Sequence, residues 1–125
     1  MRLLRIGFWT GAIVDLVAAV QLLLPTSFKL FVFQGLRPAG SAAQGAIVAA
    51  VLLLGFSGLL LWADRRPLER RAVLGVTLGV VGLLALGNVW LGASGSMAWA
   101  ELAPTLAIQA LLAALFLAGL AATRA

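Results

Sequence analysis

Four long apolar stretches, each long enough to cross a bilayer as a helix, constrain this chain more than any other feature. They run over about residues 6–24, 43–62, 72–91 and 100–121. A helix needs about 20 apolar residues to cross the hydrocarbon layer. The stretches lack the alternation of a membrane β-barrel, and only helices and closed barrels satisfy their backbone in lipid. We therefore predict an all-α integral membrane protein, a four-transmembrane-helix antiparallel bundle that forms a single domain over residues 1–125.

The composition indicates that lipid surrounds the chain, and it limits the reactions and ligands that the side chains can support. Hydrophobic residues make up 63% of the chain and charged residues 10%, against roughly 45–50% and 25% in soluble domains. The chain contains no Cys and no His, so thiolate chemistry and the commonest metal and haem ligand are excluded. We expect no metal site and no cofactor. Binding of a lipid or quinone remains compatible with this composition, since it needs only a cavity of suitable shape and a few polar groups.

The connections between the stretches carry turn residues or charge. Residues 64–67 read Asp-Arg-Arg-Pro and residues 92–96 read Gly-Ala-Ser-Gly-Ser, and both connections are short enough to predict antiparallel neighbours. The segment over about residues 26–36 is apolar but too short to cross, and it contains Lys29. We expect it to be an interfacial or re-entrant piece over the outer mouth of the bundle.

The distribution of basic residues predicts the orientation. With the N-terminus inside, the cytoplasmic segments carry Arg2, Arg5, Arg65, Arg66, Arg70, Arg71 and Arg124, and the outer segments carry Lys29 and Arg37. This bias follows the positive-inside rule and predicts both termini in the cytoplasm. The net charge of +5 is then explained by topology and anionic lipid, and we expect no nucleic-acid partner. A signal peptide over residues 1–24 is disfavoured because Asp15 interrupts its apolar region.

Asp15 is the residue that most needs an explanation, since it falls at the centre of the first stretch. A carboxylate at the middle of a membrane span costs about 2.5–3.5 kcal/mol on insertion scales. Asp15 follows Gly7 and Gly11 at helical spacing, and small residues allow neighbouring helices to approach closely. We therefore expect Asp15 to point into the bundle. Gly75, Gly79 and Gly82 predict a similar packing stripe on the third span.

The other polar residues of the spans gather on the outer side of Asp15. The predicted ligand-binding residues are Asp15, Gln21, Asn88, Glu101 and Gln109. With the topology above, they indicate a polar vestibule that opens outward and has Asp15 at its floor. Structural alternatives remain open: Asn88 and Gln109 would hydrogen-bond neighbouring spans, Glu101 would stabilise a helix N-terminus, and Asp15 would be a neutral carboxyl bonded to another span.

The first span opens with Arg5-Ile6-Gly7, is rich in glycine and closes with Leu24-Pro25. In these features and in its span count the chain resembles the small DoxX-like four-helix membrane proteins of bacteria. Some proteins of that family are described as membrane partners of quinone-linked oxidoreductases. The resemblance implies an accessory or quinone-proximal role, and it carries over no catalytic residues.

Three functions are compatible with these features. The first is a small-molecule binder or carrier that takes a lipid-like or quinone-like ligand at Asp15. The second is a non-catalytic accessory or assembly subunit, in a homo-oligomer or with a membrane partner. The third is a membrane-embedded isomerase that transfers protons between carboxylates such as Asp15 and Glu101. No set of catalytic residues is evident, so the sequence favours a protein that is not an enzyme.

Overall fold

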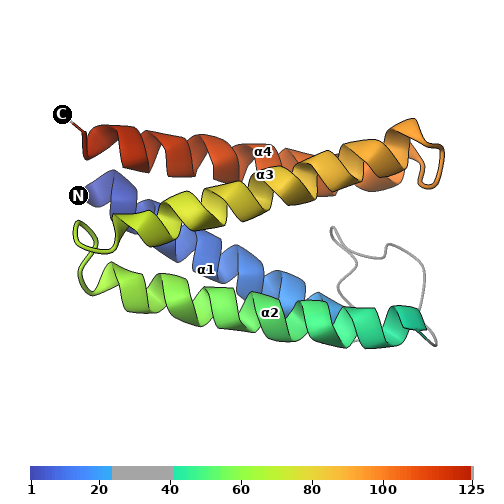
Figure 1. Ribbon diagram of the computed structural model, residues 1–125, viewed down its shortest axis with the longest axis horizontal. Coiled ribbons are helices and arrows are strands. Elements are labelled where there is room, and N and C mark those ends of the chain that lie inside the picture. The colour runs from blue at the N-terminus through green and yellow to red at the C-terminus, as the bar shows by residue number, and fades with distance from the viewer. Residues whose placement is uncertain (24–40, 125) are drawn as a thin grey trace.

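The chain folds into four long helices, seen here in a computed structural model that describes residues 1–23 and 41–124, without the side chains of residues 41–43. The helices are α1 (Arg2–Leu23), α2 (Ser41–Asp64), α3 (Arg71–Ala93) and α4 (Trp99–Ala122). Successive helices run in opposite directions (Figure 1). Over the described residues there is no strand, and the predicted segment at residues 26–36 lies outside them.

All four helices are long and apolar enough to cross a membrane. The prediction of an all-α protein with four helices of membrane-spanning length is therefore confirmed. The helices extend a few residues beyond the predicted spans, because charged residues such as Arg2 and Asp64 continue the helix past the apolar stretch. Hydropathy locates the apolar part of a span, whereas helical hydrogen bonding continues into its polar ends.

Helix α1 is the central element and crosses the bundle diagonally (Figure 1). It packs against α2 along much of its length and against α4, while α3 packs mainly on α4. More of α1 is buried than of any other helix. Helices α2 and α3 are consecutive, but they contact each other only sparsely and diverge from their short connection (Figure 1). The α1–α2 pair and the α3–α4 pair therefore separate toward one end of the molecule.

We call the other end, where α1 and α3 begin and α2 and α4 end, the arginine end. Figure 1 shows both termini and the α2–α3 connection there. Here the start of α1 contacts the end of α4, since a Cβ added at Gly119 would lie 3.4 Å from Leu3 O and from Leu4 Cα. Close backbone approach without a side chain between the helices explains glycine at this position.

The core lies on the arginine side of the bundle. The largest fully buried side chains are Leu4, Phe8, Leu60, Leu74 and Phe116, drawn from all four helices. The Oγ of buried Ser57 donates a hydrogen bond to Ala12 O at 2.9 Å, and this bond holds α2 against α1.

The α3–α4 connection is a tight turn built around one glycine. Gly95 has φ of 74°, a left-handed conformation that favours glycine. Ser94 N and Ser96 N donate to Trp90 O at 2.9 Å and Leu91 O at 3.0 Å, which satisfies carbonyls at the end of α3. The turn sets α4 antiparallel beside α3, so the predicted neighbour relation holds for this pair.

Candidate functional site

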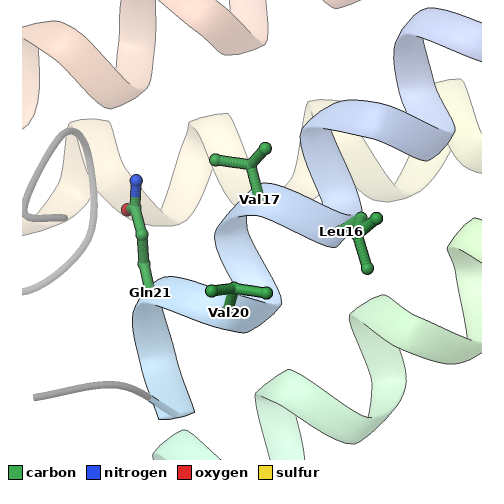
Figure 2. Close-up of a pocket in the computed structure, with 4 residues that line it drawn as sticks. All are labelled: Leu16, Val17, Val20 and Gln21. Atoms are coloured by element: carbon green, nitrogen blue, oxygen red, sulfur yellow. The ribbon is translucent and has the colours of Figure 1, made fainter.

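A cavity of about 230 Å³ lies beside the C-terminal part of α1 and is lined by Leu16, Val17, Val20 and Gln21. Residues four apart share a helix face, so Val17 and Gln21 line one side and Leu16 and Val20 the adjacent side. Figure 2 shows Val17 and Gln21 projecting to the same side of α1. The cavity is open, and it lies on the half of α1 away from the arginine end.

Gln21 is the polar residue of this cavity, and its amide is unusually placed. Only 7% of the residue is exposed. Its side-chain nitrogen and oxygen are both buried and have no hydrogen-bond partner among the described residues. Leaving a buried polar group unpaired costs about 1–3 kcal/mol. The amide offers both a donor and an acceptor to whatever occupies the cavity.

Asp15 directly precedes the lining residue Leu16, on the side of the arginine end, and is not itself among the lining residues. It is half-buried, and its side chain makes no hydrogen bond or ion pair with the residues that the structure describes. Asp15 continues the stripe of Gly7 and Gly11, which face Leu60, Leu74 and Phe116 of the other three helices. The expectation that Asp15 points into the bundle stays a prediction, and the cavity described above is lined by Gln21 and three apolar residues instead.

Two of the predicted site residues meet each other. Asn88 Nδ2 of α3 donates to Gln109 Oε1 of α4 at 3.2 Å. Their contact is the interhelical hydrogen bond that the structural alternative expected, and neither residue lines the cavity. Glu101 is exposed in the first turn of α4, where a carboxylate stabilises the helix N-terminus. Within the described ranges no hydrogen bond joins Asp15 to Glu101, and the isomerase hypothesis stays a prediction.

The Asn88–Gln109 hydrogen bond can be tested by a double-mutant cycle. We expect Asn88→Ala and Gln109→Ala to show a coupling free energy of about 0.6 kcal/mol, and less than about 2, because polar pairs in membrane helices contribute this much. Unfolding in mixed micelles, followed by circular dichroism for wild type, both single variants and the double variant, measures it. Strictly additive effects would show that the two amides do not interact in the folded protein.

The two predicted glycine stripes have different surroundings. A Cβ at Gly7 would lie 3.3 Å from Leu74 Cδ2, and one at Gly11 would lie 2.9 Å from Leu60 Cδ1 and from Phe116 Cζ. These glycines are close-packing positions, as predicted. A Cβ at Gly75, Gly79 or Gly82 would meet no heavy atom within 4 Å. The predicted packing stripe on α3 is therefore not used within the described part of the chain.

Polar contacts that join α1 to α2 at the arginine end were not predicted from the sequence. Trp9 Nε1 donates to Asp64 Oδ2 at 3.1 Å, and Arg5 Nε lies 3.6 Å from Asp64 Oδ1. Beside it, the guanidinium of Arg70 stacks 3.5 Å from the ring centroid of Trp62. The contact could have been predicted from the antiparallel arrangement of the first two spans. This arrangement places the start of the first span beside the end of the second, and so Arg5 and Trp9 near Asp64. These contacts hold α1 against α2, and none of their residues lines the cavity.

The comparisons with known proteins add no relative. The chain matches no protein-family model, no curated protein and no solved structure. The resemblance to DoxX-like proteins therefore stays an expectation from the sequence, and any function must be argued from the residues of this chain.

Proposed function

We propose that this chain is a multi-pass protein of the bacterial inner membrane, with both termini in the cytoplasm, that binds or carries a lipid-like or quinone-like molecule beside the outer part of α1. Four helices of membrane-spanning length and the concentration of arginine at one end support the placement and the orientation. The cavity at Leu16, Val17, Val20 and Gln21 would then lie in the outer half of the bilayer.

The buried amide of Gln21, which has no hydrogen-bond partner among the described residues, carries this proposal. A ligand with an apolar body and a neutral hydrogen-bonding head satisfies both the lining and the amide. At about 230 Å³ the cavity is below the roughly 300–1,000 Å³ of sites for drug-sized ligands. It therefore takes one ring or one head group, and the remainder of the ligand extends into lipid.

Two probes separate the ligand classes. A decyl-substituted benzoquinone only accepts hydrogen bonds, whereas a diacylglycerol both donates and accepts. We expect Gln21→Leu to weaken binding of the quinone about fivefold and of the diacylglycerol about thirtyfold, because each hydrogen bond contributes about 1 kcal/mol. Native mass spectrometry across a titration in mild detergent measures the bound fraction.

The matched control is Gln109→Leu, which removes the glutamine of α4 that pairs with Asn88 and does not line the cavity. It should leave both affinities unchanged. Equal affinities of Gln21→Leu and wild type for both probes would contradict the proposal. Asp15→Asn extends the test: an isosteric amide preserves packing, so a loss of binding in this variant would assign Asp15 to the same site.

A second candidate function is supported by α3. Its glycines at 75, 79 and 82 have open space at their Cβ positions, and Val76, Leu83 and Leu86 of the same helix are among the more exposed large apolar side chains. Small residues on the outside of a span favour contact with another helix. In an accessory subunit this surface of α3 would pack against a partner or a second copy, and Gly79→Leu would then disrupt the complex while leaving the monomer folded.

A further inference from the structure

The net positive charge of the chain is concentrated at the arginine end. Of nine basic residues, Lys29 and Arg37 belong to the α1–α2 connection, and of four acidic residues Asp15 and Glu101 lie away from this end. Seven arginines and two carboxylates remain at the arginine end. Their excess of five equals the formal net charge of +5, so the other charges cancel.

Four of these arginines are engaged by the protein itself. Arg5 pairs with Asp64, and Arg66 Nη1 lies 3.2 Å from Glu69 Oε2. Arg70 Nη1 donates to Trp62 O at 2.6 Å, and Arg71 Nη1 donates to Thr123 O at 3.3 Å. The last contact joins the beginning of α3 to the end of α4. These hydrogen bonds and ion pairs hold the helix ends together and leave part of the charge uncompensated.

Arg2, Arg65 and Arg124 are exposed, and their side chains have no hydrogen-bond or ion-pair partner within residues 1–23 and 41–124. They come from the beginning of α1, the α2–α3 connection and the residues after α4, three segments that meet at the arginine end (Figure 1). Their guanidinium groups are thus available to an anionic partner outside the protein.

Exposed large apolar side chains lie within or next to the arginine end. Leu3, Trp9 and Trp62 are 44%, 52% and 48% exposed, and all belong to helix segments within or next to the arginine end. Tryptophan and arginine side chains at the end of a span are typical of the membrane interface, where the ring lies at headgroup level. The nearest abundant anion at that level is the phosphate of a phospholipid.

We infer that the arginine end is a binding surface for anionic phospholipid headgroups, with Arg2, Arg65 and Arg124 as the phosphate contacts. This inference rests on the membrane placement in the proposed function, but not on the cavity or on Gln21. The exposed apolar side chains favour a lipid partner, because they can lie beside acyl chains while the guanidinium groups reach the phosphates.

The test uses the full chain in nanodiscs that contain equal amounts of phosphatidylglycerol and phosphatidylcholine. Native mass spectrometry of protein released from the discs gives the ratio of the two lipids retained. We expect wild type to retain phosphatidylglycerol preferentially. Arg65→Gln/Arg124→Gln should reduce that preference by about five- to thirtyfold at low salt, since each arginine near the surface contributes about a factor of five.

The matched control is Lys29→Gln/Arg37→Gln, which removes the same charge from the α1–α2 connection, and it should keep the preference. Loss of preference in both double variants would overturn the inference, because it would reflect net charge alone. Absence of any preference in wild type would overturn it too, as would displacement of phosphatidylglycerol by a short duplex oligonucleotide. Gln21→Leu should retain wild-type selectivity, so failure of this inference and failure of the cavity proposal are distinguishable.

Discussion

Replacing Gly11 with leucine should lower the free energy of unfolding by about 3 kcal/mol, the upper part of the range for overpacked cores. A Cβ at this position would already lie 2.9 Å from Leu60 Cδ1 and from Phe116 Cζ. Both neighbours are fully buried, so neither side chain can move aside without displacing others. Unfolding in mixed micelles by circular dichroism measures the change, and α1 would have to shift away from α2 and α4 to accommodate the new side chain.

Gly79→Leu is the control because it makes the same change in the middle of another span. A Cβ at Gly79 would meet nothing within 4 Å. Any gain in helix propensity is common to the two variants and cancels in their difference. We expect the monomer of Gly79→Leu to be at least as stable as wild type. If the two variants were equally destabilised, the packing assigned to α1 would be wrong.

The two glycine stripes show what sequence spacing can and cannot predict. Gly7 with Gly11 and Gly75 with Gly79 follow the same four-residue spacing, yet only the α1 pair lies against other helices. Spacing identifies a face on which another helix can approach closely. Which helix approaches depends on how all four spans pack together, and here α1 takes the central place while α3 lies at the edge, mainly against α4.

Helix number and span positions were predictable because the length of an apolar stretch directly determines whether it can cross a bilayer. The position of the cavity was not. Asp15 attracts notice in the sequence because a carboxylate in the middle of a membrane span costs free energy. Gln21 does not, because a polar residue near the end of a span is common. Its importance arises from the burial of its amide without a hydrogen-bond partner among the described residues, which the sequence does not reveal. By contrast, the expectation that Asn88 and Gln109 bond between spans is confirmed.

Replacing Phe116 with alanine should also destabilise the fold, by about 3 kcal/mol. This value is the lower end of the range for Phe→Ala in soluble cores, because lipid chains are as apolar as the core and little transfer free energy is lost. The remaining loss of stability comes from the cavity that the missing ring leaves beside Gly7 and Gly11. A Cβ added at these glycines would lie 3.6 Å and 2.9 Å from the ring of Phe116. Leu83→Ala is the control, since Leu83 is 71% exposed, and it should change stability by less than about 0.5 kcal/mol.

The double variant Gly11→Leu/Phe116→Ala provides the strongest test of this contact. Leucine at position 11 would occupy space that the ring of Phe116 vacates, since a Cβ at Gly11 already lies 2.9 Å from Phe116 Cζ. The overpacking and the cavity then offset each other, and the double variant should be more stable than the sum of the two single effects predicts by about 1–3 kcal/mol. Simple additivity would mean that α1 and α4 do not meet at these residues, and the arrangement with α1 at the centre would have to be abandoned.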